Sequence, residues 1–363
     1  MSDTKILDFQ SRFETILNNS ATNLIDDFHF VSLASDKKPW FDTGIAVATG
    51  DCFTSFATGQ TQFKDLPLRF DANFQIWFRI GLDGEIFRGT RDSHSFTAEK
   101  SGQLYLASYF PGEWASKTGE LSTPNEVYDW VTGYFEILLL RWHGDSINGL
   151  KQLVKYGDVE NLVASEIDRL ESPVVKPEGW DYLWFLGDAE IYKSVQLPEK
   201  PSTICCHTHK NGGLLQKSVS LAFKPDTRLR WSWKMDLLPS AVREDTLPTH
   251  DYLSIAVEFD NGQDITYYWS AELEPETVYR CPIPTWHDRE THVVIRSGSQ
   301  DLGKWLNEER DVYADYQSAI GGDLPKNIVK IWFIAVSLFQ RQEGRCQYSD
   351  ISFLNDGRVI SIQ

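Results

Sequence analysis

The sequence has few cysteines and fewer basic than acidic residues, and each shortage argues against a class of protein. The five cysteines include no C-x-x-C pair and are widely spread: Cys52, Cys205, Cys206, Cys281 and Cys346. An odd, scattered set predicts free thiols in a cytoplasmic chain rather than a disulfide framework. Lysine and arginine number 35 against 52 acidic residues, for a net charge of -17. Nucleic acids and anionic membranes need basic surface, so neither is expected as a partner.

Long apolar runs and the common catalytic motifs are also missing. The apolar run 137–140 is far shorter than the roughly 20 residues of a membrane-spanning helix. Residues 1–5 lack the basic and apolar regions of a signal peptide. The sequence has no nucleophile elbow, no H-E-x-x-H and no G-x-G-x-x-G motif. It therefore gives no support to hydrolysis by an elbow serine, to zincin chemistry or to dinucleotide-dependent redox chemistry, respectively. Residues 298–304 begin like a phosphate-binding loop, but Trp305 replaces the required Ser or Thr.

Aromatic residues, by contrast, are abundant, with 13 Trp, 14 Tyr and 21 Phe. Such a content is typical of β-sandwiches, and short strand-like runs separated by Gly, Pro, Asn and Asp agree with it. We expect an all-β chain with minor helices, including one over residues 310–320. The expected parts are an N-terminal helix or strap (1–27), a β-sandwich (28–144), a helical connector (145–177) and a jelly-roll domain with the candidate site (178–363). The apolar spacing Ile6, Phe9, Phe13, Ile16 and Leu17 predicts the first helix.

The clearest hairpin signal lies in residues 249–270, T-H-D-Y-L-S-I-A-V-E-F-D-N-G-Q-D-I-T-Y-Y-W-S. Two strand-like runs flank Asn261 and Gly262, a pair that favours a type I′ turn because both central residues need positive φ. A two-residue loop would place Phe259 opposite Asp264. A three-residue loop with a bulge would instead shift the pairing by one residue.

With the two-residue loop, one face of this hairpin has the composition of a binding site. It combines small residues, aromatic residues and carboxylates: Tyr252, Ser254, Ala256, Glu258, Asp260, Tyr267 and Trp269. The opposite face is an ordinary core layer of Leu253, Ile255, Val257 and Phe259. The alternative is that the first face is simply solvated, as one face of an antiparallel sheet often is.

A second group of titratable residues, 287–292, precedes a predicted strand. His292 and Arg296 share one face of that strand, and beside the hairpin they would converge with Glu258 and Tyr267. A carboxylate, an imidazole and a phenol suffice for proton transfer without a cofactor. We therefore expect these four residues to be catalytic. Five further residues are expected to bind the substrate: Tyr252, Asp260, Trp269, His250 and Arg310. The alternatives are a surface charge cluster at 287–292 and a salt-bridged helix face for Arg310.

Metal binding is not expected from the sequence. Cys205, His207 and His209 would share one face of a strand, but residues 210–220 contain no carboxylate. A tetrahedral site needs a fourth ligand from elsewhere. A strand with outward polar residues is therefore the favoured interpretation.

Residues 40–142 contain W-F-D-T-G-I-A-V-A-T-G-D, F-Q-I-W-F-R-I-G, H-S-F-T-A-E-K-S-G-Q-L-Y-L-A and G-Y-F-E-I-L-L-L-R-W. In this order the segments resemble the bacterial galactophilic-lectin-like, or galactose-binding-like, β-sandwich family. The resemblance implies a sandwich in which a sugar-binding calcium follows the L-Y-L-type strand, held by an Asn-Asp pair and later Asn residues. Tyr109 and Phe110 stand in place of that pair here. The resemblance thus implies the scaffold without the calcium site.

Residues 228–354 contain L-R-W-S-W-K-M-D-L-L-P, H-D-Y-L-S-I-A-V-E-F-D, I-T-Y-Y-W-S, V-V-I-R-S-G and W-L-N-E-E-R-D-V-Y-A-D-Y. These segments resemble a bacterial domain-of-unknown-function family with a galactose-binding-like jelly roll. The resemblance implies the fold and supplies no chemistry, because the family has no assigned reaction.

Two hypotheses of different class follow. The leading one is a cofactor-independent lyase, isomerase or cyclase that acts on a small, partly apolar molecule by general acid–base chemistry. Glu258 would be its base or acid, Tyr267 and His292 would donate protons or hydrogen bonds, and Arg296 would stabilise negative charge. The alternative is a non-catalytic, lectin-like protein in which Trp269 stacks on a sugar. Either way we expect a small-molecule or sugar-like ligand and neither cofactor nor metal; a homo-oligomer is compatible with the sequence.

Overall fold

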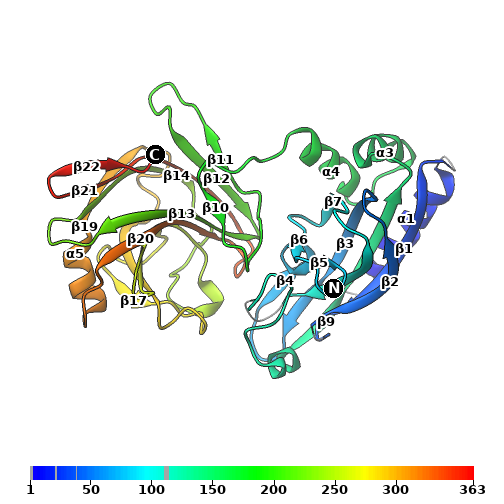
Figure 1. Cartoon of the computed structure of the whole chain (residues 1–363), viewed down its shortest axis with the longest axis horizontal. Coiled ribbons are helices and arrows are strands. Elements are labelled where there is room, and N and C mark those ends of the chain that lie inside the picture. The colour runs from blue at the N-terminus through cyan, green and yellow to red at the C-terminus, as the bar shows by residue number, and fades with distance from the viewer. Residues whose placement is uncertain (1–2, 21–22, 38, 110–113) are drawn as a thin grey trace. The chain divides into compact units, whose positions relative to one another are not determined.

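The computed structural model describes residues 3–20, 23–37, 39–109 and 114–363, without the side chains of residues 3–7. Phe110, which belongs to the loop compared with the calcium site, and the side chain of Ile6 therefore lie outside the described part. The chain forms two compact units (Figure 1). The first comprises Met1–Pro173 and Trp184–Asp188, and the second comprises Val174–Leu183 and Ala189–Gln363. Both are β-sandwiches with short helices, which confirms the predicted fold class.

The first unit packs two sheets against each other. Sheet I has the order β1 (Ile25–Ala34), β9 (Val131–Trp142), β3 (Cys52–Phe63) and β4 (Arg69–Asp71), with β7 (Ser93–Thr97) also paired to β3. Sheet II has the order β2 (Phe41–Val47), β8 (Gly102–Ser108), β5 (Ile76–Ile80) and β6 (Phe87–Arg88). The helical segments are α1 (Asp3–Asn19), α2 (Ala72–Gln75), η1 (Asn125–Trp130), α3 (Ser146–Leu153), η2 (Val154–Tyr156) and α4 (Leu162–Glu171).

The centre of sheet I is buried on both faces. Strand β9 carries four consecutive apolar residues, 137–140, none of which has any exposed surface. Ile137 and Leu139 belong to the core between the two sheets, whereas Leu138 and Leu140 pack in a second core with the helices. Because a strand alternates its side chains between two faces, a strand covered on both sides reads as a continuous apolar run.

Three helices form that second core on the outer face of sheet I. Helix α1 contributes Phe9 and Phe13, which confirms the helix predicted from their spacing. Helices α3 and α4 occupy most of the segment expected as a connector, 145–177. They contribute Leu150 and Val163 to the same core and belong to the first unit. None of the described helices is long and apolar enough to cross a membrane.

The second unit is also a sandwich of two sheets (Figure 1). Sheet III has the order β10 (Asp181–Tyr182), β13 (Gly212–Ala222), β20 (Asn327–Val336), β15 (Tyr252–Phe259), β16 (Asp264–Ser270), β18 (Glu290–Ser297) and β17 (Val278–Arg280). Sheet IV has the order β11 (Tyr192–Val195), β12 (Thr203–His209), β21 (Glu343–Asn355), β14 (Arg228–Leu237) and β19 (Leu306–Asp311), with β22 (Arg358–Ser361) paired to β21. The helical segments are η3 (Leu247–Thr249), α5 (Val312–Asp315) and η4 (Tyr316–Ile320).

The central hairpin, β15–β16, has a different register from the one predicted. Phe259 donates its N–H to the carbonyl of Gln263 at 2.9 Å, so it does not pair with Asp264. Of the two turn residues Asn261 and Gly262, only Gly262 has positive φ, at +79°. A type I′ turn needs positive φ at both positions, so the loop is instead the three-residue alternative, which shifts the pairing by one residue.

This shift exchanges the faces of β16. Tyr267 and Trp269 point into the core between sheets III and IV, together with Ile255 of β15. Thr266 and Tyr268 take their place on the outer face, opposite Ala256 and Ser254 respectively. The expected pairing of small residues with Tyr267 and Trp269 is therefore wrong.

The outer face of sheet III is not solvated around β15, β16 and β18. Tyr252 and His292 on this face have 3% and 0% exposed surface. His250, from the loop before β15, packs on both rings with centroids 4.8 Å apart in each pair. Tyr279 of β17 stacks on His292 at 4.9 Å. This layer of aromatic and imidazole rings makes the outer face of the sheet a small core of its own.

Candidate functional site

The nine residues expected to form one site are spread over the second unit. Glu258 forms an ion pair with Lys330, whose Nζ lies 2.9 Å from a carboxylate oxygen. Arg296 binds Glu308 through two N–H groups at 2.8 and 3.1 Å. Asp260 accepts hydrogen bonds from the segment that leads into β20. The expected catalytic group therefore does not converge.

Three others lie in or beside the sandwich core. The hydroxyl of Tyr267 donates to Asp315 at 2.9 Å, and Arg310, which lies on β19 rather than on a helix, binds the same carboxylate at 2.7 Å. Trp269 donates its indole N–H to the carbonyl of Gly298 at 2.9 Å. Tyr267 and Arg310 join sheets III and IV through Asp315, and none of these three side chains lines a binding face.

The remaining three, His250, Tyr252 and His292, do come together on the outer face of sheet III. They meet two residues that the sequence analysis did not select, Cys281 and Glu290. We call His250, Cys281, Glu290 and His292 the buried donor cluster, because their ligand-type atoms all lie within 4.8 Å of one another and none of the four is exposed by more than 2%. It is the one group of this kind among the described residues.

Three segments position the buried donor cluster: the loop before β15, the residue after β17, and β18. Glu290 and His292 are two residues apart on β18, so they share a face. Cys281 follows β17 and donates its backbone N–H to the carbonyl of Glu290 at 3.0 Å. The Sγ atom of Cys281 lies 3.4 Å from Nε2 of His250, and Nε2 of His292 lies 3.4 Å from a carboxylate oxygen of Glu290.

Burial and mutual contact set the protonation of this cluster. Burial, followed by the neighbouring His292, lowers the pKa of His250 to about 3, so its imidazole is neutral. Burial alone would raise the pKa of Glu290, but the neighbouring His292 outweighs burial and lowers it to about 2. Burial and the Glu290 charge raise the pKa of the Cys281 thiol well above its ordinary value. The cluster thus contains a neutral imidazole and a carboxylate, two ready metal ligands.

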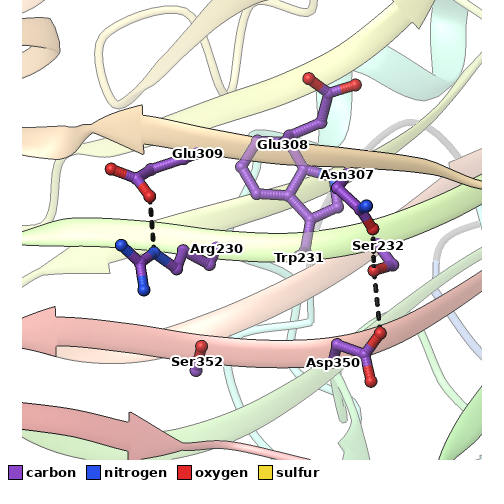
Figure 2. A pocket seen from close by; sticks show the side chains of 8 residues that line it. All are labelled: Arg230, Trp231, Ser232, Asn307, Glu308, Glu309, Asp350 and Ser352. Carbon is purple, nitrogen blue, oxygen red and sulfur yellow. Dashed lines mark hydrogen bonds and ion pairs between the residues drawn. The ribbon is translucent and has the colours of Figure 1, made fainter.

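A second feature is an open groove of about 420 Å³ on sheet IV. We call it the polar groove; its lining residues are Arg230, Trp231, Ser232, Asn307, Glu308, Glu309, Asp350 and Ser352 (Figure 2). They come from β14, β19 and β21, which lie side by side in the sheet. Strand alternation sends Trp231 into the core and Arg230 and Ser232 outward.

The hydrogen bonds of the polar groove are centred on Ser232. Its Oγ lies 2.7 Å from the amide oxygen of Asn307 and 2.9 Å from a carboxylate oxygen of Asp350 (Figure 2). Lys200 donates to the same Oγ at 3.0 Å and also forms an ion pair with Asp350. Its ammonium group lies 5.5 Å from the ring centre of Trp305, which is half-buried. The groove therefore contains an amide, a hydroxyl and a carboxylate, with the ammonium group of Lys200 in contact with them and the indole of Trp305 next to that ammonium group.

A β-bulge aims Asp350 into the polar groove. Arg230 pairs with Ser352 and Ser232 pairs with Ser349, so β21 has one more residue than β14 between these pairs. Asp350 itself has φ of +54°. Bulges of this kind redirect a side chain and are common beside functional sites. A sequence without an alignment gives no sign of this bulge, because the pairing partners are over one hundred residues apart.

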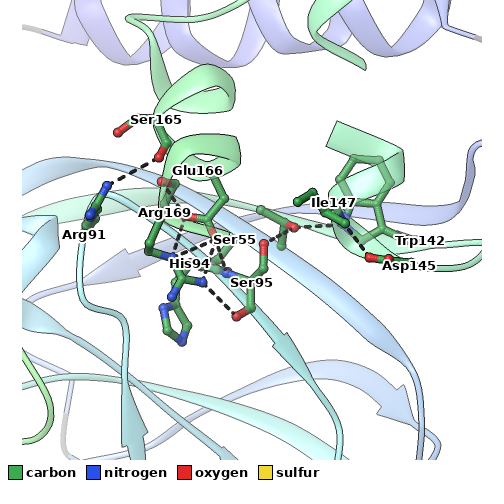
Figure 3. A network of polar contacts seen from close by, with 12 residues as sticks. Ser55, Arg91, His94, Ser95, Trp142, Asp145, Ile147, Ser165, Glu166 and Arg169 are labelled. Carbon is green, nitrogen blue, oxygen red and sulfur yellow. Dashed lines mark hydrogen bonds and ion pairs between the residues drawn. The ribbon is translucent and has the colours of Figure 1, made fainter. Parts of the chain in front are cut away.

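The first unit contains a different kind of polar cluster, which anchors α4 to β7 (Figure 3). The carboxylate of Glu166 accepts hydrogen bonds from the Ser95 N–H at 2.6 Å, the Ser93 hydroxyl at 2.9 Å and Arg169 at 2.8 Å. Glu166 has no exposed surface and Arg169 has 8%. A charged pair that is buried and fully hydrogen-bonded in this way holds a helix in place and offers no opening to a ligand.

Comparison with known proteins gives one family match and leaves the chemistry open. Residues 178–352 match a family described as "Protein of unknown function (DUF3047)". This match bears out the resemblance of the C-terminal half to a family without an assigned function. No curated protein matches the chain significantly.

Among solved structures, those similar to the chain include a lectin domain and two sets of carbohydrate-binding modules. The N-terminal domain of EclA, a PllA-like lectin, has 15% identity and a TM-score of 0.25, covering 33% of this chain and 99% of its own. The family 11 carbohydrate-binding module of Lic26A-Cel5E from Clostridium thermocellum has 14% identity and a TM-score of 0.25, covering 51% of this chain and 84% of its own. The CBM22 tandem domain of Xyn10C from Paenibacillus barcinonensis has 9% identity and a TM-score of 0.23, covering 92% of this chain and 94% of its own. Scores this low say nothing about a ligand of this chain.

Proposed function

We propose that this protein binds carbohydrate without catalysis, through the polar groove of its second unit. The observation that carries the proposal is the spare hydrogen-bonding capacity at Ser232. Its single hydroxyl hydrogen faces two acceptors, Asn307 and Asp350, and can serve only one of them at a time. Asp350 is also paired with Lys200, so the acceptor left for a hydroxyl group of a ligand is the amide oxygen of Asn307. Sugars present donors and acceptors at every ring position, so they suit such a groove.

The size and openness of the groove agree with this proposal. A volume of about 420 Å³ falls within the range of roughly 300–1,000 Å³ that is typical of small-ligand sites. Trp305, next to Lys200, has an apolar ring surface close to these polar groups. An apolar ring beside fixed polar groups fits the two kinds of surface that a pyranose presents.

Binding is favoured over hydrolysis because each carboxylate of the groove is paired with a cationic side chain. Glu309 lies 2.6 Å from Arg230, and Glu308 lies 2.8 Å from Arg296. Burial would raise the pKa of Asp350, but hydrogen bonds from Lys200 and Ser232 outweigh it and leave the pKa below its ordinary value. A glycosidase needs one carboxyl group that is still protonated when it meets the substrate. Ionised carboxylates act as acceptors for sugar hydroxyls instead.

The proposal is tested with the full chain and a panel of soluble β-glucan, xylan, mannan and galactan, by affinity electrophoresis followed by calorimetry. Asn307→Ala and Asp350→Gly should weaken binding roughly 10–100-fold, as expected for lost hydrogen bonds to charged or polar partners. Lys193→Ala is the matched control, since Lys193 is exposed on β11 of the same sheet and does not line the groove. The proposal fails if no polysaccharide binds, if binding survives both groove substitutions, or if the polysaccharide is cleaved.

A further inference from the structure

The buried donor cluster plays no part in the polar groove and is explained better by a bound ion. We propose that His250, Cys281, Glu290 and His292 hold a zinc(II) ion with a structural role. Two imidazoles, a thiolate and a carboxylate are the ligand types of tetrahedral zinc. Zinc–ligand bonds of roughly 2.0–2.3 Å require donors a few ångströms apart, and all four donors lie within 4.8 Å of one another.

His292 gives an independent indication of a missing partner. Within the described part of the chain, neither of its ring nitrogens has a hydrogen-bond partner, although the residue has no exposed surface. Its Nε2 points toward the cluster, 3.4 Å from Glu290. A buried polar group without a partner is costly and calls for an explanation, such as an unseen ion. A metal ion on Nε2 would satisfy this nitrogen.

Neighbouring groups orient two of the four ligands, His250 and Glu290, as metal sites require. Nδ1 of His250 lies 2.7 Å from the carbonyl of Glu244, so it carries the proton and leaves Nε2 free to face Cys281. One oxygen of Glu290 accepts hydrogen bonds from the hydroxyls of Tyr252 and Thr266, each at 3.0 Å. Metal-ligating histidines almost always donate their other N–H in this way, and ligating carboxylates are themselves hydrogen-bonded.

The choice of zinc follows from the donor set. A thiolate and two imidazoles favour zinc or copper over magnesium and calcium, which prefer oxygen ligands. Glutamate as a fourth ligand makes a closed, four-coordinate set, typical of structural zinc rather than of a blue-copper site with a weak axial ligand. Because all four ligands are buried, no position is left open for a substrate.

Such an ion would cross-link three segments of the chain on the outer face of sheet III. His250 precedes β15, Cys281 follows β17, and Glu290 and His292 begin β18. The parallel pair β16–β18 forces a crossover through residues 271–289, and Cys281 lies within it. The ion would fix this crossover, together with the loop before β15, on the outer face of sheet III. The competing explanation is a metal-free contact between Glu290 and His292.

The full chain is unfolded in denaturant with a chelator and refolded with or without zinc, then dialysed and analysed for metal. The proposal predicts close to one zinc per chain and a higher unfolding midpoint for the zinc-refolded protein. Refolding with cobalt(II) should give a thiolate-to-cobalt charge-transfer band and the ligand-field bands of a tetrahedral site. Wild-type protein that retains no metal, with the same midpoint under both conditions, would overturn the proposal.

Two substitutions and a matched control locate the ion. Cys281→Ser should abolish the charge-transfer band, and Tyr252→Phe, which removes only the hydroxyl that supports Glu290, should weaken zinc binding roughly 10–100-fold. Cys205→Ser is the control, because Cys205 is a half-buried free thiol on sheet IV, close to His207 in sequence. Unchanged cobalt spectra in Cys281→Ser, or loss of the band in Cys205→Ser, would show that the metal lies elsewhere. Neither result bears on the polar groove, so the two proposals are tested separately.

Discussion

Asp350 accepts a hydrogen bond from Ser232 across the join between β21 and β14, with Oδ2 and Oγ 2.9 Å apart. The contact depends on the backbone of Asp350, whose φ of +54° directs the carboxylate into the polar groove. Aspartate tolerates this conformation better than most residues, and β-branched residues tolerate it worst. The residue type at this position therefore affects both the stability of the bulge and the chemistry of the groove.

The first prediction separates these two effects. Asp350→Val should destabilise the protein by about 1–2 kcal/mol more than Asp350→Gly, since only the valine has an unfavourable left-handed conformation. Both substitutions remove the same side-chain hydrogen bonds. The difference between the unfolding free energies of the two variants therefore reports the cost of the backbone conformation at residue 350. Urea unfolding at equilibrium measures it. Equal stability of the two variants would mean that Asp350 does not adopt positive φ.

The second prediction concerns the buried pair that anchors α4. Glu166→Gln leaves Arg169 charged and buried, with 8% exposed surface. Removing one partner of such a pair typically costs about 3–5 kcal/mol, and we expect a loss of that size in the first unit. Glu171→Gln on the same helix is the control, because its ion pair with Lys151 has both side chains 46% exposed. That change should cost less than about 1 kcal/mol. Similar losses in the two variants would argue against a buried Glu166.

The third prediction concerns the pH dependence of the second unit. Burial raises the pKa of Glu244 from 4.5 to about 7, against opposing hydrogen bonds from Ser270 and Ala271. The folded state holds this proton more tightly than the unfolded state, so its stabilising effect is full below pH 4.5 and is lost as pH rises through 7. A shift of that size corresponds to about 3 kcal/mol.

Glu244→Gln keeps the shape of the side chain and removes its titration. Urea unfolding of both proteins at pH 4.5 and pH 8 should show wild-type stability falling relative to the variant, by up to about 3 kcal/mol. The comparison with the variant cancels every other titrating group, including the buried donor cluster. A stability difference that is the same at both pH values would contradict the raised pKa of Glu244.

The sequence predicts local features of this fold better than pairings between distant segments. The apolar spacing of Phe9 and Phe13 is sufficient to predict α1, because a helix is a local structure. Asn261 and Gly262 correctly place a hairpin, but two loop lengths accept this pair and they differ by one residue in register. The register decides on which face of the sheet Tyr267 lies. An ambiguity of one residue in the loop therefore made the predicted composition of the outer face wrong.

The candidate sites depend on contacts between distant segments. Glu290 and His292 have the spacing of two ligands on one strand face, and this signal could have been read from the sequence. Cys281 could not have been added to them from the sequence, because it comes close to Glu290 and His292 only when β17 pairs with β18. Asp350 reaches Ser232 only through a bulge that appears once β21 lies beside β14. The acid–base enzyme expected from the sequence stays a prediction, as does its cytoplasmic location.

The most direct test of carbohydrate binding is a structure of the full chain with the oligosaccharide that binds best in the polysaccharide panel. The account predicts a sugar in the polar groove, with hydroxyl groups within hydrogen-bonding distance of Asn307, Ser232 or Asp350. A sugar bound anywhere else on the chain, or a groove that stays empty at saturating ligand, would contradict it.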